Sequence, residues 1–563
     1  MLINTLDNLE QILTEQGKLT SSQVERALKY AKNNSLSFEK SIIDLHFLTE
    51  KALLETKAEI LGQRSVDLTT FPVASEAAMS VTENIARSYT LIPLMKGKGV
   101  ITIAMADPMN MEAIEDVETH THCRVETMLA NERDIVEAIE TSFGVYGRVE
   151  ELLNQASRDR LEMSHSMSDD SKVENANIEG PIAQIVQLII TQAVNSNASD
   201  IHIEPLEKRL RVRFRIDGLL QEAFTFEKIY QAALTSSAKI MCAMDIAEKR
   251  IPQDGRFRIM INDRPIDLRA STFPAMHGEK FVYRILDKES ANVELSQLGI
   301  EENSFEKINK VIHQPHGVFL VTGPTGSGKT TTLYSVLKEV NTPLVNVNTM
   351  EDPVEFDLDT VNQGQVNVKS GLTFAKGLRA MMRQDPDIIM IGEIRDGETA
   401  EIATQAALTG HLVLSTLHTN NAPGAVARLV DMGVEQFLVA SSLAGVLAQR
   451  LVRRLCKKCK KPYSSTSEIC ERFMLDPSEG YTFYRAMGCR ECGRTGYKGR
   501  AGIYEFMSAT EEIRTLIVSG KSTSELREQA IKDGMKTLQM DGIQKAIQGI
   551  TSIEEVLRVA GGT

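Results

Sequence analysis

A glycine-rich run that ends in lysine and threonine can hold the phosphate groups of a nucleotide. The run is GPTGSGKT, Gly323–Thr330; the apolar, β-type stretch 318–321 precedes it and the helix-forming TTLYSVLKEV follows. This order of strand, loop and helix is the context that the pattern G-x-x-x-x-G-K-[ST] requires. The glycines let backbone N–H groups turn toward phosphate oxygens, and the helix N-terminus adds partial positive charge.

We therefore expect ATP at this loop. Lys329 should contact the β- and γ-phosphates, and the Thr330 hydroxyl should coordinate Mg²⁺. The other residues expected to bind the nucleotide lie in the same loop and the first helical turn. They are Gly323, Pro324, Thr325, Gly326, Ser327, Gly328 and Thr331.

Carboxylates follow two further apolar stretches. Glu393 follows the expected buried strand 388–391 in DIIMIGEIRD, at the edge where open α/β sheets bind ligands, and there it can hold the Mg²⁺ shell or position water. A second group follows the apolar-rich stretch 344–347, in TMEDPVEF. Its members are Glu351, Asp352 and Glu355. Such a run is commonly a solvated loop, but a strand end at the same sheet edge favours one of the three as the carboxylate that activates water.

Two histidines bracket another expected strand, in GHLVLSTLH. They are His411 and His418. A lone histidine is more often structural, whereas two at the ends of a strand beside this site can sense the γ-phosphate.

Four of the seven cysteines form two C-x-x-C pairs. They are Cys456, Cys459, Cys489 and Cys492. In a reducing compartment this double pattern fits a closed, tetrahedral Zn²⁺ site, the alternative being four unrelated thiols. Because thiolates take all four positions, no place is left for water. The zinc is therefore expected to be structural and not catalytic.

Composition narrows the class of protein. The chain has 563 residues, enough for three or four domains, with 42% hydrophobic and 25% charged residues. The net charge of −13 argues against a protein that binds a phosphate backbone. We find no apolar run of about 18 residues and no secretory signal in MLINTLDNLEQIL. We expect a cytoplasmic protein.

The elements that must position these residues divide into four segments. We expect a helical plus small α/β N-terminal domain over 1–145 and a flexible, polar linker over 146–178. A compact α/β domain should cover 179–295. Residues 296–563 alternate apolar runs with helical segments, as a parallel sheet covered by helices does. This last domain includes a tetracysteine subdomain, 453–495, and a helical C-terminus.

An arginine-bearing strand is the clearest element of the 179–295 segment. In RLRVRFRIDG the apolar residues alternate strictly with Arg209, Arg211, Arg213 and Arg215, and an Asp-Gly turn closes the strand. The arginine face can simply be solvated, or it can serve a subunit interface or face phosphate.

These motifs together resemble those of the secretion ATPase superfamily, specifically the type II secretion and type IV pilus assembly ATPases. The resemblance is specific over about 180–563 and looser over 1–145. The motifs that carry it are GPTGSGKT, TMEDPVEF (the aspartate box), RQDPDIIMIGEIRD (the Walker B region), TGHLVLSTLHTN (the histidine box), ASDIHIEP with FRIDG, and EKRIPQDGR.

The resemblance implies a fold and a set of roles. The fold is a RecA-like P-loop NTPase core preceded by a smaller, PAS-like α/β domain, assembled as a hexameric ring. ATP would lie between one subunit's RecA-like domain and the neighbour's preceding domain. Glu355 would be the general base and Glu393 the Walker B acid. Arg269 (in DLRAST) and Arg284 (in FVYRIL) match the arginines that reach toward the γ-phosphate.

The N-terminal region departs from one pattern of the family. Some relatives bind cyclic di-GMP through a repeated motif that contains an arginine and a glycine. Here Asn8 and Glu10 stand at the corresponding positions, Gly17 remains, and His46 replaces an expected glycine. We therefore expect no binding of cyclic di-GMP.

The resemblance implies a hexameric ATPase that powers pilus or pseudopilus assembly at the inner face of the bacterial inner membrane. Its partners would be an integral-membrane platform protein and cytoplasmic docking components, and no nucleic acid. The N-terminal block favours the pilus over type II secretion. Three alternatives remain: a nucleic-acid translocase, a non-hydrolysing nucleotide sensor, and a pilus retraction motor. The acidic charge and cysteine pairs argue against the first, Glu355 and Glu393 against the second, and the N-terminal region with the cysteine pairs against the third.

Overall fold

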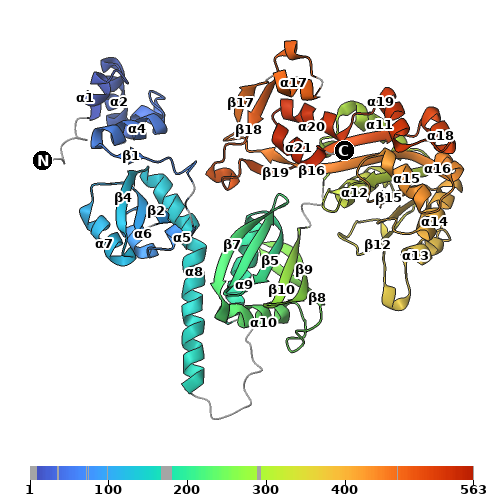
Figure 1. Ribbon diagram of the computed structural model, residues 1–563, viewed down its shortest axis with the longest axis horizontal. Helices are drawn as coiled ribbons and strands as arrows, with labels where there is room; N and C mark the ends of the chain where they lie inside the picture. Colours follow the sequence, from blue (N-terminus) through green and yellow to red (C-terminus); the bar gives the residue numbers. More distant parts are fainter. Residues whose placement is uncertain are drawn as a thin grey trace. The chain divides into compact units, whose positions relative to one another are not determined.

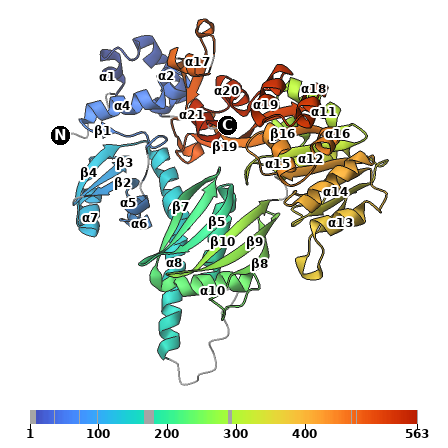
Figure 2. The same cartoon turned by 45° about the vertical axis from the view of Figure 1, so that its right-hand side comes forward.

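A computed structural model describes residues 9–34, 37–71, 73, 75–97, 99–165, 180–287, 293–465, 467–473 and 475–561 (Figures 1 and 2). The chain forms two compact units. The first comprises the described residues up to Gln192 together with Gly488–Arg494, and the second comprises Ala193–Met487 with the described residues from Thr495 onward.

The first unit begins with four short helices around a small apolar core. They are α1 (Leu9–Glu15), α2 (Ser21–Asn34), α3 (Phe38–Asp44) and α4 (Glu50–Leu61). The helical part expected for the N-terminal domain is therefore present. Asn8, one of the positions compared with the cyclic di-GMP motif, lies outside the described residues.

A small α/β layer follows in the same unit. Its elements are β1 (Arg64–Ser65), α5 (Ser75–Ala78), α6 (Glu83–Ser88), β2 (Leu91–Gly97), β3 (Val100–Met105), α7 (Met111–Thr121) and β4 (Arg124–Leu129). The sheet order is β1-β4-β3-β2, and β2 and β3 form an antiparallel pair.

Helix α8 corrects one expectation. It runs without interruption over Glu132–His165 and so covers the first part of the segment 146–178 that was expected to be a flexible linker. Glu, Arg, Leu, Gln and Ala dominate this stretch, and their helix propensity sustains a helix even where few apolar residues are available. Residues 166–179 lie outside the described residues, so the linker stays a prediction there.

Within the predicted segment 179–295, six antiparallel strands form one sheet, drawn in green in Figures 1 and 2. The elements are α9 (Pro181–Asn195), β5 (Ala198–Pro205), β6 (Arg209–Ile216), β7 (Leu219–Glu227), η1 (Lys228–Tyr230), α10 (Gln231–Met241), β8 (Gln253–Ile261), β9 (Arg264–Ala275) and β10 (Gly278–Asp287). The strand order is β7-β6-β5-β10-β9-β8.

Strand β6 confirms the predicted alternation. Its apolar side chains Leu210, Val212 and Phe214 are buried. On the other face, Arg211 and Arg213 bind the carboxylate of Glu204 on β5 at 3.0 and 2.7 Å. Asp217 and Gly218 close the strand with φ values of 48° and 85°. Two of the four arginines thus pair with a carboxylate of the neighbouring strand in the same sheet.

A seven-stranded sheet forms the core of the second unit, with the order β13-β12-β14-β15-β11-β16-β19. Only the β16–β19 pair is antiparallel. The elements are η3 (Leu295–Leu298), α11 (Glu302–Ile312), β11 (Gly317–Thr322), α12 (Lys329–Val340), β12 (Val347–Glu351), β13 (Asn362–Gln365), η4 (Val368–Ser370), α13 (Phe374–Met381), β14 (Ile388–Ile391), α14 (Gly397–Leu408), β15 (Leu412–Leu417), α15 (Pro423–Asp431), α16 (Gln436–Ser442), β16 (Leu443–Leu455) and β19 (Tyr497–Ser508).

Helices cover both faces of this sheet. Along β11, Val318 and Leu320 pack into a core with residues of α13 to α16, whereas Phe319 and Val321 pack into a second core with α11 and α12. Both sets are buried because successive strand residues point to opposite faces. This three-layer α/β arrangement explains why β11 reads as a continuous apolar run.

The remaining elements lie after β16. They are β17 (Lys461–Ser464), α17 (Ser467–Phe473), η5 (Pro477–Glu479), β18 (Thr482–Arg485), η6 (Arg490–Cys492), α18 (Glu511–Val518), α19 (Thr523–Lys532), α20 (Leu538–Ile547) and α21 (Ile553–Ala560). Strands β17 and β18 form a separate antiparallel pair. No helix among the described residues combines the length and apolar character needed to span a bilayer.

Candidate functional site

The sheet order brings the predicted motifs together. Four adjacent parallel strands, β12, β14, β15 and β11, end at the same edge of the sheet. The aspartate box follows β12, Glu393 follows β14, His418 follows β15, and the glycine-rich loop follows β11. Ligands bind at the carboxyl ends of parallel strands in open α/β sheets. This edge is therefore the candidate active site.

The glycine-rich loop has a positive φ at three residues, Gly323, Gly326 and Gly328, a conformation that residues with a side chain rarely adopt. Gly323 has a φ of 150°, and a Cβ there would lie 2.4 Å from the carbonyl oxygen of Gln449. Gly328 has a φ of 88° and directly precedes α12. The loop hydroxyl of Ser327 is buried without a hydrogen-bond partner. Such a loop can direct its N–H groups toward phosphate oxygens.

Lys329 points back into this loop. Its Nζ donates to the carbonyl oxygens of Gly323 at 2.9 Å and Pro324 at 3.2 Å. Burial lowers the pKa of the Lys329 ammonium, and the nearby Glu393 partly opposes that shift. An anion in the loop would relieve the cost of burying this charge. Thr330 is exposed in the first turn of α12, where its hydroxyl can reach a bound cation.

Gln449 of β16 holds the glycine-rich loop through side-chain hydrogen bonds. The sequence did not predict this role. The Gln449 side chain is buried, its Nε2 donates to the Ser327 carbonyl at 2.7 Å, and its Oε1 accepts from Thr332 at 2.8 Å. It therefore ties the loop to the first turn of α12. In the sequence Gln449 follows the apolar stretch 443–448 of β16 and is itself followed by Arg450, so nothing distinguishes it from an ordinary polar residue of the strand.

Glu393 lies between the guanidinium of Arg395 and the imidazole of His418. The Arg395 guanidinium forms a close ion pair with one carboxylate oxygen, and the His418 Nε2 lies 3.2 Å from the other. Burial alone would raise the pKa of Glu393, but Arg395 and His418 together hold it below its usual value. Glu393 is therefore a charged carboxylate at neutral pH, as a ligand to a Mg²⁺ shell must be. Arg395 belongs to the motif GEIRD, but the sequence alone indicates no role for it.

The three carboxylates after β12 have different environments. Glu351 is buried and accepts hydrogen bonds from Tyr334, Thr349 and Gln363. Asp352 lies 3.4 Å from the Arg395 guanidinium. Of the three carboxylates, that of Glu355 pairs with a residue of the six-stranded sheet, Arg269 of β9. Because the hydrogen bonds of Glu351 hold it inside the core, Glu355 is the carboxylate best placed to act on water.

The two predicted arginines differ in position. Arg269 of β9 lies 3.1 Å from the Glu355 carboxylate and donates to the Val354 carbonyl at 3.0 Å. Arg284 of β10 pairs with Asp200 at 3.2 Å and is 61% exposed. The structure thus brings Arg269 to the aspartate box of its own chain and does not bring Arg284 there.

The two predicted histidines lie at opposite ends of β15. His418 contacts Glu393, as described above, whereas His411 precedes the strand and its Nδ1 lies 2.8 Å from the Ala406 carbonyl. A strand of six residues spans about 20 Å. His411 is therefore remote from the glycine-rich loop, and the structure does not support its expected role beside the γ-phosphate.

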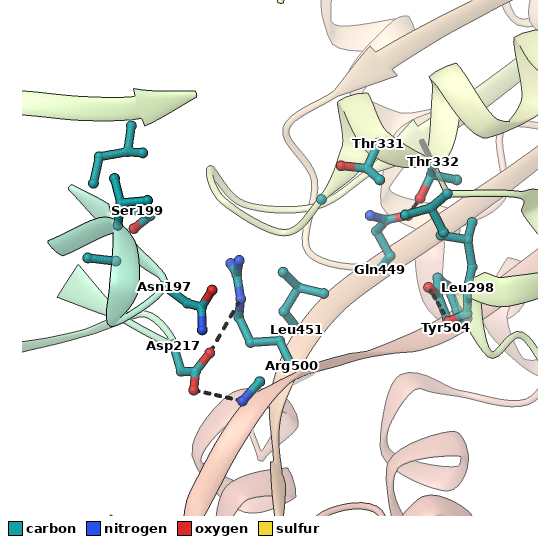
Figure 3. Close-up of a pocket in the computed structure, with 16 residues that line it drawn as sticks. Asn197, Ser199, Asp217, Leu298, Thr331, Thr332, Gln449, Leu451, Arg500 and Tyr504 are labelled. Atoms are coloured by element: carbon teal, nitrogen blue, oxygen red, sulfur yellow. Dashed lines mark hydrogen bonds and ion pairs between the residues drawn. The ribbon is translucent and has the colours of Figure 1, made fainter. Parts of the chain in front are cut away.

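A cavity of about 490 Å³ opens beside the start of α12 (Figure 3). Its lining includes Asn197, Ser199, Leu298, Gly328, Thr331, Leu451 and Tyr504. On one side, Asp217 accepts a hydrogen bond from the Gly499 N–H at 2.9 Å and lies 3.9 Å from the Arg500 guanidinium. The mixed apolar and polar walls suit the base and ribose of a nucleotide whose phosphates lie in the loop.

The four predicted cysteines converge. The sulfur atoms of Cys456, Cys459, Cys489 and Cys492 all lie within 4.8 Å of one another. Three of these side chains are buried and Cys459 is half-buried. Four thiolates at this spacing fit tetrahedral coordination of Zn²⁺ with no open position. The cluster can therefore hold a structural zinc.

Comparisons with known proteins agree with this geometry. Residues 175–558 match the family described as type II/IV secretion system protein, and residues 61–147 match the MshEN domain. The type IV pilus assembly ATPase PilB of Myxococcus xanthus is 40% identical over 98% of this chain and 98% of its own. The type II secretion system protein E of Xanthomonas campestris pv. campestris is 40% identical over 98% of this chain and 97% of its own.

Among solved structures, the ATPase DotB of Legionella pneumophila covers 68% of this chain and 96% of its own, with a TM-score of 0.51 and 21% identity. At this identity the likeness concerns the fold alone.

Proposed function

Because the chain belongs to the type II/IV secretion system protein family and is an ATPase, we propose that it powers the assembly of type IV pili. The observation that carries this proposal is the match to the Myxococcus xanthus pilus assembly ATPase along nearly the whole of both chains, N-terminal region included. Assembly of a type II secretion pseudopilus is the second candidate, because the Xanthomonas campestris protein matches over a similar extent.

The proposed reaction is attack of water on the γ-phosphate of ATP. The loop N–H groups and Lys329 would hold the β- and γ-phosphates, while Thr330 and Glu393 would hold the Mg²⁺ shell. Mg²⁺, when bound, neutralises charge on the phosphate oxygens. Glu393 suits this role because Arg395 and His418 keep its pKa low and the carboxylate charged.

Glu355 is the proposed general base, and Arg269 the cation that meets the charge developing on the transferred phosphoryl group. Support comes from their 3.1 Å ion pair and from the contrast with the buried, fully hydrogen-bonded Glu351. In this structure Arg269 engages the carboxylate itself. Binding of ATP would offer the guanidinium a phosphate oxygen and free Glu355 to accept a proton.

The proposed assembly is a homo-hexamer at the inner face of the bacterial inner membrane. The motor would act on an integral-membrane platform protein, with the N-terminal unit docked on cytoplasmic components of the machine. Domain rotation, as each site closes on ATP and reopens after hydrolysis, would supply the mechanical output. Arg284, exposed on the six-stranded sheet, is available to a neighbouring subunit in such a ring.

Deletion of the gene in its host, with complementation, tests the choice of machine. We expect the deletion strain to lose surface pili and to keep normal export of secreted enzymes. The wild-type gene should restore the pili and Lys329→Ala should not. If the deletion strain instead lost export and kept its pili, the protein would be a type II secretion ATPase.

A further inference from the structure

Glu505 of β19 is a buried carboxylate with two backbone partners. It is 1% exposed, one oxygen accepts from the Ala422 N–H at 2.8 Å, and the other accepts from the Leu538 N–H at 3.3 Å. Ala422 is the N-cap of α15 and has no side chain that could cap it, and Leu538 begins α20. One carboxylate thus accepts backbone hydrogen bonds at the N-termini of two helices, where the helix dipole is positive.

The segment that Glu505 holds on one side belongs to the nucleotide site. Thr322, the last residue of β11, directly precedes the glycine-rich loop, and its Oγ1 accepts from the Thr419 N–H at 3.0 Å. The hydroxyl of Thr419 donates to the Asn421 carbonyl at 3.0 Å. His418, one residue earlier, contacts Glu393. Residues Thr419–Ala422 therefore connect the loop and the Walker B carboxylate to Glu505.

A second side chain ties the same segment to the C-terminal helices. Arg450 of β16 donates to the Asn420 side-chain oxygen at 3.2 Å and to the Val559 carbonyl of α21 at 2.8 Å. Together with Glu505, it joins this short segment to both α20 and α21. A displacement of the segment therefore cannot leave α20 unaffected unless hydrogen bonds of the buried Glu505 carboxylate are broken, which is costly.

We propose that Glu505 is a positioning residue for ATP hydrolysis that holds segment Thr419–Ala422 in register with the glycine-rich loop and transmits its movements to α20. The inference goes beyond the proposed function, because it concerns how the ATPase core works in either machine. It assigns to β19, which bears none of the nucleotide motifs, a part in coupling the site to the C-terminal helices.

Asp541 provides a matched control. It is also a buried carboxylate on α20, at 4% exposure, and accepts from a β19 backbone group, the Tyr504 N–H, at 2.8 Å. The Asp541 carboxylate also pairs with the Lys545 ammonium at 2.7 Å. Burial raises the pKa of both Glu505 and Asp541. Asp541 is therefore, like Glu505, a buried carboxylate that joins β19 to α20, but it does not contact the segment Thr419–Ala422.

Steady-state hydrolysis of Mg–ATP by the full-length protein tests the proposal. Glu505→Gln keeps the size of the side chain but replaces one acceptor with a donor. We expect kcat to fall about tenfold while KM changes by no more than about twofold. This combination indicates that the substitution weakens stabilisation of the transition state and not binding of ATP. Asp541→Asn should keep kcat within about twofold. A normal kcat for Glu505→Gln, or an equal loss for Asp541→Asn, would overturn the proposal.

Amide hydrogen exchange of the wild-type protein tests the coupling through Glu505 even if Glu505→Gln does not fold. A non-hydrolysable ATP analogue should slow exchange at the amides of both Ala422 and Leu538, and should slow neither in Lys329→Ala. Protection at Ala422 alone, or at neither amide of the wild type, would contradict coupling through Glu505.

Discussion

The carboxylates after β12 show how neighbouring residues of one chemical type come to have different roles. Glu351 accepts three hydrogen bonds inside the core, whereas Glu355 is 28% exposed and meets only the cationic head of Arg269. A buried acceptor surrounded by donors is held in place by the fold. A partly exposed carboxylate with a displaceable partner can take a proton from water.

This contrast predicts different defects for two equivalent substitutions. Glu355→Gln should reduce kcat at least about a hundredfold with an unchanged melting temperature, because it removes a general base from a partly exposed position. Glu351→Gln should destabilise the protein by about 1–3 kcal/mol, because it turns an amide donor toward buried donors. Phosphate release and thermal unfolding of both variants would check this. Equal effects on both observables would refute the distinction.

At the scale of elements, the order of the strands explains the site. The motifs are separated by tens of residues, yet β12, β14, β15 and β11 are neighbours and parallel, so their carboxyl ends meet. Strand β16 lies next to β11 and places Gln449 under the loop. The loop is therefore positioned by the strand beside it as well as by the strand that precedes it.

Gln449 should accordingly govern nucleotide affinity without taking part in chemistry. Gln449→Met fills a similar volume but loses two hydrogen bonds of about 1 kcal/mol each, so we expect ATP to bind roughly ten- to thirtyfold more weakly. Calorimetric titration with a non-hydrolysable analogue would measure this. Gln405→Met, on the exposed face of α14, is the control and should bind normally. Unchanged affinity in Gln449→Met would show that the loop keeps its shape unaided.

Much of this element-level picture could be predicted from the sequence. The apolar strand 318–321, the glycine-rich loop and Glu393 have local signatures, because strand, turn and helix are set by nearby residues. The support by Gln449 and the pairing of Arg269 with Glu355 could not be predicted, since both join residues far apart in the chain. His411 was misplaced for a related reason: a strand's two ends look alike in sequence, but only one end faces the ligand. Likewise, the helix over 146–165 was missed because its polar composition resembles that of a linker.

At the scale of the molecule, the cysteine cluster joins segments that are distant along the chain. Cys456 and Cys459 follow β16, while Cys489 and Cys492 precede β19. Coordination of one metal ion by all four would therefore link the two ends of the segment that contains β17 and β18. A metal that binds the folded form alone stabilises it. The described cysteine cluster leaves no coordination site for water, so this stabilisation should be separable from catalysis.

We therefore expect one zinc per chain in the purified protein by elemental analysis. Removing it with a chelator should lower the melting temperature. Cys456→Ser should lower both the zinc content and the melting temperature, whereas Cys123→Ser, outside the cluster, should change neither. Normal zinc content in Cys456→Ser would rule out this cluster as the site.

The central claim is that the shared edge of β12, β14, β15 and β11 holds ATP and hydrolyses it. Phosphate release by the purified full-length protein with Mg–ATP tests this most directly. The account predicts steady turnover by the wild type and, for Lys329→Ala of the same oligomeric state, a rate lower by at least about a hundredfold, since Lys329 is the cation aimed into the loop. Equal rates for the two proteins would contradict it.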